Sequence, residues 1–196
     1  MAKTLLQKFQ SELTALPSEE IIRKYITTGM PVHLSEDDYF NLRKVIAHEF
    51  KLHPSSVVLI GSCRLGFSIA PKKRYRLARP DSDLDVAIVS AEQFDVYWDA
   101  VFSYSVANRG WTYGKSYDRF LKMLFSGWID PRGLPNVARF KEAADWANFF
   151  DGLMQSRKFG PRRITARLYR NWSRLEAYQD VAVRKCLANI GDIKSA

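Results

Sequence analysis

Two short apolar segments between residues 57 and 90 decide the fold. The first reads VVLIGS (57–62) and the second reads SDLDVAIV (82–89). Apolar, β-branched runs bounded by turn-forming residues are typical of buried strands. Gly61 permits a tight turn directly after the first strand, and Ser62 stands where a helix can begin. The hydroxyl and the free backbone N–H groups of such a turn are able to hold a phosphate.

A pair of aspartates opens the second strand. Asp83 and Asp85 are two residues apart, so on a strand both carboxylates point to the same face. Two such carboxylates repel each other unless a cation lies between them, and Mg²⁺ binds carboxylates together with substrate phosphates. A site of this kind, with Mg²⁺ or Mn²⁺, activates a hydroxyl and stabilises leaving pyrophosphate. The alternative is an ordinary turn at 80–83 followed by a solvated strand residue.

The motifs GS (61–62) and DLD (83–85), in this order and each beside an apolar strand, resemble the signature of the DNA polymerase β-like nucleotidyltransferase superfamily. The resemblance implies transfer of a nucleoside monophosphate from ATP or another nucleoside triphosphate to an acceptor hydroxyl. The residues that it implies are Asp83 and Asp85 as catalytic metal ligands, and Gly61, Ser62, Arg64 and Ser68 as nucleotide-binding residues.

The chain departs from the family pattern in two places. It has 20 residues between Ser62 and Asp83, more than is usual, and we expect the excess to form a basic loop beside the mouth of the site. Basic residues interleaved with an aromatic suit contact with phosphates and bases, although such a loop can also be merely solvated. Many members carry a third carboxylate on a later strand, for which Asp130 is the candidate here. The loop residues expected to contact phosphate or nucleic acid are Lys72, Lys73, Arg74, Arg76 and Arg79.

Helical periodicity surrounds these strands, before residue 53, after Ser90, over 116–126 and over 138–154. The segment 163–170 alternates, with Ile164, Ala166 and Leu168 on one side, which predicts a third strand. Its other face is basic and either lines a phosphate-binding cleft or faces water. Strands interleaved with helices indicate an α/β fold. By the resemblance we expect a small mixed sheet of nucleotidyltransferase type, flanked by helices. The predicted organisation is a single domain over 1–196, with N-terminal helices at 1–53, the core at 54–170 and a C-terminal helix at 171–196, capped by Asn171 or Ser173.

Charge and composition narrow the class of partner. The 196 residues carry a formal net charge of +9, with a sequence pI near 9.6, which favours an anionic partner such as a nucleotide or nucleic acid. The two cysteines are far apart and fit a reducing compartment. No apolar run approaches the ~20 residues that cross a bilayer, and the N-terminus lacks the apolar region of a secretion signal. We therefore expect a cytoplasmic protein that does not enter a membrane.

The sequence leaves the acceptor and the catalytic competence open. A nucleic-acid end and a protein hydroxyl both fit as acceptors, and a small molecule fits the positive charge less well. The alternative function is a non-catalytic module of the same fold that binds nucleic acid or a protein partner through its basic face. A weaker alternative is a structural subunit of a larger complex. Mg²⁺ dependence separates the first two, because a basic surface loses affinity with salt and ignores the metal.

Overall fold

A four-stranded mixed sheet lies at the centre of the computed structural model, which describes residues 2–108, 114–134 and 140–194. The strand order is β1-β2-β4-β3, where β1 pairs antiparallel with β2, β2 parallel with β4, and β4 antiparallel with β3. The sheet is therefore built around a parallel pair contributed by segments far apart in the chain. The strands are β1 (Val57–Ile60), β2 (Leu84–Val89), β3 (Trp128–Ile129) and β4 (Ile164–Tyr169).

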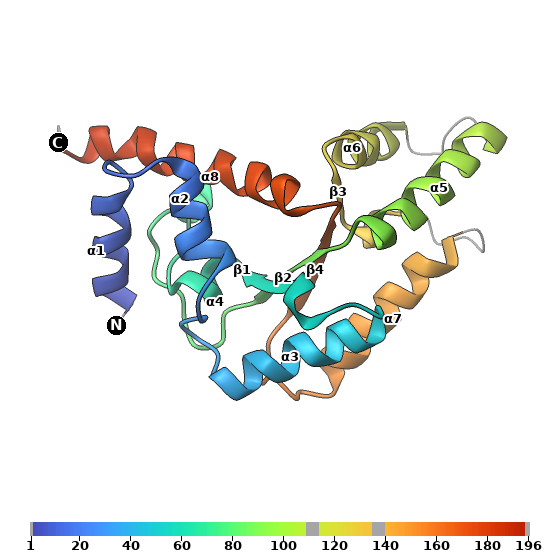
Figure 1. The fold of residues 1–196 in the computed structure, drawn as a ribbon, viewed down its shortest axis with the longest axis horizontal. Coiled ribbons are helices and arrows are strands. Elements are labelled where there is room, and N and C mark those ends of the chain that lie inside the picture. Colours follow the sequence, from blue (N-terminus) through green and yellow to red (C-terminus); the bar gives the residue numbers. More distant parts are fainter. Residues whose placement is uncertain (1, 109–113, 135–139, 195–196) are drawn as a thin grey trace.

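Helices occupy both faces of this sheet, so the protein is of the α/β class that its sequence predicts (Figure 1). The helices are α1 (Ala2–Glu12), α2 (Ser18–Ile22), α3 (Glu36–Glu49), α4 (Gly61–Leu65), α5 (Ala91–Asn108), α6 (Gly114–Phe125), α7 (Lys141–Gln155) and α8 (Trp172–Lys194). A π-helical turn, η1 (Arg23–Thr27), extends α2, and three 3₁₀ turns are η2 (Pro54–Ser56), η3 (Pro71–Lys73) and η4 (Pro131–Gly133).

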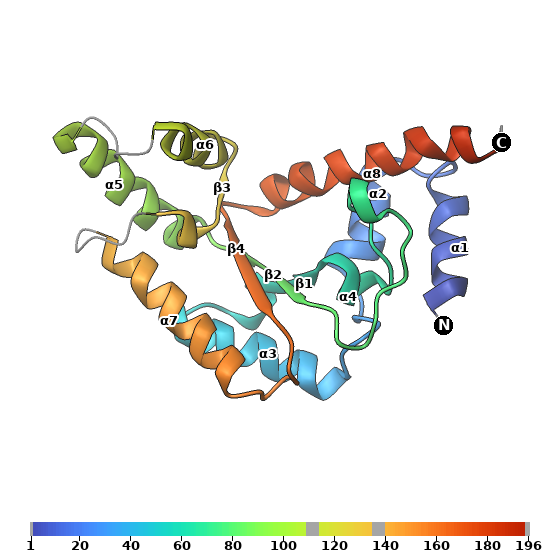
Figure 2. The same cartoon turned by 180° about the vertical axis from the view of Figure 1, so that it is seen from behind.

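Alternation along the strands divides the core into two layers. One face of the sheet packs with α3, α5, α6 and α7, and the other packs with α1, α2, α4 and α8, as Figures 1 and 2 show from opposite sides. Val57 and Leu59 of β1 point into the first layer, whereas Val58 and Ile60 point into the second. Asp85 and Arg167 belong to the second face by the same period-two rule, so the polar strand residues lie on the side covered by α8.

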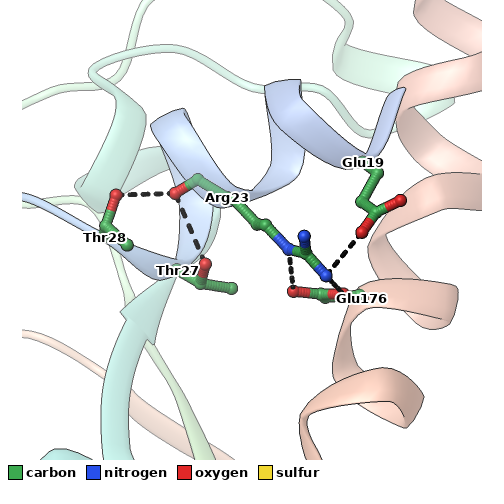
Figure 3. Close-up of polar contacts among 5 residues, drawn as sticks. All are labelled: Glu19, Arg23, Thr27, Thr28 and Glu176. Carbon is green, nitrogen blue, oxygen red and sulfur yellow. Dashed lines mark hydrogen bonds and ion pairs between the residues drawn. The ribbon is translucent and has the colours of Figure 1, made fainter. Parts of the chain in front are cut away.

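Helix α8 is tied to the N-terminal helices by an arginine. The Arg23 guanidinium donates to both carboxylate oxygens of Glu176 at 3.0 and 3.2 Å and contacts Glu19 at 2.5 Å (Figure 3). Asn171 caps the start of α8, as the sequence predicts: its side chain accepts a hydrogen bond of 3.0 Å from the Arg174 backbone N–H. These contacts fix the direction in which α8 crosses the sheet.

The sequence predicts three of the four strands and most helix positions, with differences at the short or irregular elements. The predicted strand at 163–170 is β4, with the expected alternation of buried residues. Strand β3 was not predicted, since two residues show no periodicity. The helix predicted over 138–154 is observed as α7, and its first two predicted residues lie outside the described ones. Among the described helices, none is both long and apolar enough to cross a membrane.

Candidate functional site

The turn after β1 is built around a glycine that has no room for a side chain. Gly61 has a φ of +73°, a left-handed conformation that other residues rarely adopt. A Cβ atom at this position would lie 2.5 Å from Oδ2 of Asp85. The glycine therefore lets a carboxylate of the neighbouring strand lie directly against the backbone of the turn. Helix α4, which starts here, has only five residues, so Ser62 rather than a long helix dipole supplies the polar group.

The two aspartates predicted from the DLD motif lie together at the start of β2. Asp85 is half-buried and paired in register with Ile60 of β1 and Thr165 of β4. Its Oδ1 atom accepts a hydrogen bond of 2.7 Å from the Thr165 hydroxyl. Asp83 directly precedes the strand and is exposed. Both carboxylates therefore line the same pocket. Asp85 is held by its hydrogen bond within the sheet, whereas Asp83 is exposed at the start of the strand.

Burial is the main reason that the pKa of Asp85 lies above its ordinary value, and the negative charge of Asp83 raises it further. The Thr165 hydrogen bond and the positive charges of Arg167 and Arg163 act in the opposite direction without cancelling the rise. The ionised form of Asp85 is therefore less favourable in the folded protein than in water. A cation placed between the two carboxylates would offset that cost.

Both aspartates line a pocket of about 620 Å³ on the face of the sheet that α8 covers. Its walls come from the β1–α4 turn, the segment that links α4 to β2, the edge of β4, and one side of α8. The lining residues are Ile60, Gly61, Ser62, Ser68, Ile69, Ala70, Pro71, Lys73, Arg76, Leu77, Ala78, Arg79, Asp81, Ser82, Asp83, Asp85, Arg167, Tyr178, Gln179, Val181 and Ala182.

The basic segment forms one wall of this pocket and is folded back on itself. Phe67 and Leu77 form an antiparallel bridge, and the Ser68 backbone both donates to Arg76 and accepts from Tyr75. The Tyr75 hydroxyl then donates to the carbonyl of Cys186 in α8 at 3.2 Å. The excess residues between the two motifs are therefore an ordered hairpin anchored on α8, which supports the expectation that they lie beside the site.

Arg167 lies within β4, paired in register with Ala87 of β2, and its guanidinium contacts two aromatic rings. Its guanidinium carbon lies 5.8 Å from the ring centroid of Trp128 and 5.5 Å from that of Tyr178. In the described part of the chain it forms no ion pair with Asp85, although both line the pocket. The predicted basic face of the strand thus contributes one positioned arginine to the pocket.

Several predicted site residues lie elsewhere. Arg64 is 3% exposed and donates to the backbone carbonyls of Tyr25 and Gly29, so it holds the N-terminal helices and does not reach the pocket. Lys72 and Arg74 are absent from the lining, while Ser68, Lys73, Arg76 and Arg79 belong to it. Asp130 caps η4 by accepting from the Arg132 backbone N–H at 3.1 Å and does not line the pocket either.

The residues present suit a magnesium ion held by few protein ligands. Within the described ranges there is no group of three or more His, Cys, Asp or Glu side chains able to hold a metal. Mg²⁺ commonly uses one or two carboxylates and completes its coordination with waters and substrate phosphates. The Oδ1 atom of Asp85 is occupied by Thr165, whereas no hydrogen bond to Oδ2 is formed within the described residues. That oxygen and the Asp83 carboxylate are the available ligands.

Among the polar residues of the pocket, sequence reasoning did not single out Gln179. It is 6% exposed and stands between Leu175 and Val183 on the buried side of α8. On the same helix the apolar side chains of Trp172 and Leu187 are 41% and 43% exposed, so the buried stripe does not include them. A polar residue within an otherwise apolar helical stripe was the signal that would have indicated it.

A scan against models of protein families, a search of curated proteins and a search of solved structures each return no match to this chain. The function is therefore inferred from the residues of the site.

Proposed function

We propose that the protein is a Mg²⁺-dependent nucleotidyltransferase of the DNA polymerase β type. The observation that carries the proposal is the packing of Asp85 against Gly61, with Asp83 and Ser62 beside them in one pocket. The glycine-serine turn and the aspartate pair are separated in sequence, and their motifs resemble those of this superfamily. An ordinary turn needs no carboxylate packed against its backbone. Here the left-handed conformation of Gly61, which other residues rarely adopt, brings Asp85 into that position.

The remaining pocket residues suit a triphosphate. Ser62 offers a hydroxyl at the turn, and the positively charged residues Lys73, Arg76 and Arg79 also line the pocket. Arg167 presents a guanidinium whose rotation is restricted by two rings, which suits charge–charge contact with a phosphate oxygen. We assign these side chains to binding and orienting the phosphates.

Asp83 and Asp85 are the residues that would hold the metal. Mg²⁺, when bound, supplies charge neutralisation for the reacting phosphates and for the leaving pyrophosphate. In the proposed reaction the acceptor hydroxyl oxygen bonds to the α-phosphorus, the bond between that phosphorus and the bridging oxygen of the β-phosphate breaks, and one proton is released. The acceptor is a hydroxyl of a nucleic acid or a protein, which the basic rim of the pocket favours through its charge.

The test is pyrophosphate release by the full chain with each of the four ribonucleoside triphosphates. Reactions contain Mg²⁺ or Mn²⁺, with and without RNA, DNA or cell extract as the acceptor source. The Asp83→Ala, Asp85→Ala double variant should abolish release. Asp81→Asn is the matched control, because Asp81 lines the same pocket but pairs with Arg79 at 3.0 Å. Equal release by the wild type and the double variant would refute the proposal.

A second candidate function rests on the residue that β4 places next to Asp85 in the sheet. Strand β4 places Thr165 rather than a carboxylate beside Asp85. Among the described residues no group of three His, Cys, Asp or Glu side chains is arranged to hold a metal. A non-catalytic module that binds nucleic acid or a protein partner through its basic face would need no such carboxylate. Nucleic-acid binding that weakens with salt and ignores Mg²⁺, without pyrophosphate release in any condition, would favour this candidate.

A further inference from the structure

Arg64 is a buried cation with no carboxylate in contact with it. Its side chain is 3% exposed, and no ion pair joins it to a residue that the structure describes. Nε and Nη1 donate to the carbonyls of Tyr25 and Gly29, whereas Nη2 forms no hydrogen bond with the described residues. Carbonyl oxygens satisfy donors but carry no net charge. Because buried charges are normally paired, a negative group from outside the chain would complete this one.

The same arginine lines a second pocket, of about 200 Å³, which we call the Arg64 pocket. It shares no lining residue with the pocket that contains the aspartate pair. The two pockets lie at different ends of α4, because Gly61 and Ser62 line the first and the last two residues of the helix line the second. The lining of the Arg64 pocket includes Lys8, Lys24, Thr28, Gly29, Arg64 and Leu65.

The charges of the Arg64 pocket have one sign. Lys8 of α1, Lys24 of η1 and Arg64 of α4 line it, and none of the described lining residues is a carboxylate. Lys24 pairs at 2.7 Å with Glu12, which lies outside the lining. Lys8 is exposed and forms no ion pair within the described ranges. The positive charges of Lys8 and Arg64 are therefore both without a contacting carboxylate.

We propose that the Arg64 pocket binds a phosphate group in its dianionic form. A phosphate monoester carries about −1.5 to −2 charges at pH 7 and three strong acceptor oxygens, which matches two uncompensated cations better than a carboxylate with one charge. The free Nη2 of Arg64 offers N–H donors in the fixed geometry that suits phosphate oxygens. Lys8 supplies a mobile ammonium group from the exposed side of the pocket. None of these residues takes part in the proposed transfer reaction.

A phosphate held by these two cations would connect the first helix to the sheet. Helix α1 packs on the core through Phe9, whose ring lies 5.1 Å from those of Tyr25 and Phe67. The bound anion adds a polar contact between Lys8 of α1 and Arg64 of α4 to this apolar one. A ligand that binds only the folded state stabilises it, so phosphate should slow backbone hydrogen exchange in α1.

The test follows backbone amide NMR signals of the full chain during titration with inorganic phosphate or glycerol 3-phosphate. The Gly29 and Leu65 signals report on the Arg64 pocket, and both should shift to saturation. Lys8→Gln should raise Kd about tenfold, since it removes one charge-assisted contact. Lys3→Gln is the matched control, because Lys3 is also exposed on α1 but lies outside the lining, and its Kd should equal that of the wild type.

Two further controls identify the site and the charge of the ligand. Arg76→Gln removes a cation from the pocket of the aspartate pair and should leave the Gly29 and Leu65 titrations unchanged. Acetate at the same ionic strength should bind at least about tenfold more weakly than phosphate, because it carries a single charge. Arg64 itself is kept, since its donors also hold two backbone carbonyls.

Three results would overturn the inference. The Gly29 and Leu65 signals might fail to saturate with either phosphate, Lys8→Gln and Lys3→Gln might bind equally, or acetate might bind as tightly as phosphate. The first result would identify Arg64 as a residue that only holds the N-terminal helices. Saturation with both phosphates would assign the site to a terminal phosphate group, and saturation with inorganic phosphate alone would assign it to the free ion. Neither result depends on pyrophosphate release, so this inference and the proposed function fail separately.

Discussion

Replacing Gly61 by alanine adds a methyl group where the carboxylate of Asp85 lies. The added Cβ would be 2.5 Å from Oδ2, whereas an ordinary van der Waals contact begins at 3.4 Å, so the carboxylate must move by about 0.9 Å. The same movement disturbs the hydrogen bond from Thr165. Misplacement of a reacting group by ~1 Å typically costs on the order of 100-fold in rate, and we expect a loss of this size in pyrophosphate release.

The backbone contributes a separate loss of stability. Gly61 has a φ of +73°, and a non-glycine residue in the left-handed region costs about 1–2 kcal/mol. For a chain of this size each 1 kcal/mol lowers Tm by about 2–4 °C. Gly61→Ala should therefore melt about 2–8 °C lower than the wild type, which leaves it folded at assay temperature.

Gly160→Ala separates the two effects. Gly160 has a φ of +81°, and its nearest neighbour to an added Cβ is Nε of Arg162 at 3.7 Å. Alanine there meets the same backbone strain but no close contact and lies outside the pocket lining. We expect Gly160→Ala to lose similar stability and to keep full activity, as measured by thermal denaturation and pyrophosphate release. Equal activity of Gly61→Ala and Gly160→Ala would refute the argument that the contact between Gly61 and Asp85 forms the reacting site.

Three further predictions concern charge and packing. Burial raises the pKa of Asp85, so the folded protein is stabilised by the protonated carboxyl below the unfolded pKa and loses that stability as pH rises through the folded pKa. Asp85→Asn removes the ionisation and should melt higher than the wild type at neutral pH without divalent metal. Thermal denaturation as a function of pH is the measurement. Arg76→Ala should lower the slope of log affinity for single-stranded nucleic acid against log salt by about 0.7, whereas Lys72→Ala, outside the lining, should leave the slope unchanged. Phe150→Ala, at a fully buried position among other aromatic rings, should reduce the free energy of unfolding in urea by about 3–5 kcal/mol.

Local patterns were sufficient to locate the elements that carry the aspartate pair. The apolar runs before Gly61 and after Asp83 predicted β1 and β2, because they are short, rich in β-branched residues and bounded by turn-forming residues. The alternation of Ile164, Ala166 and Leu168 predicted β4 in the same way. The parallel pairing of β2 with β4 was not predictable from these segments, since it joins residues about 80 positions apart through the fold as a whole.

Residues whose roles depend on tertiary contacts were assigned less well. Arg64 follows the glycine-serine turn and was expected to bind a nucleotide, but the N-terminal helices enclose it and their carbonyls satisfy its guanidinium. Gln179 was overlooked although it interrupts the apolar stripe of its helix, because the stripe alone does not show that this face of the helix lines a pocket. Sequence patterns describe an element and its exposed face, whereas these two side chains are defined by what packs over them.

The arrangement around Asp85 bears on the choice between an active and a vestigial site. A protein that had lost its cation could neutralise this buried carboxylate most simply with the neighbouring arginine. Instead, Trp128 and Tyr178 hold the Arg167 guanidinium on their rings, and Thr165 supplies a neutral hydrogen bond to the carboxylate. Since no ion pair with Asp85 forms among the described residues, the negative and positive charges both remain available to a ligand. A metal ion and a phosphate group are the two ligand components that would use both charges together.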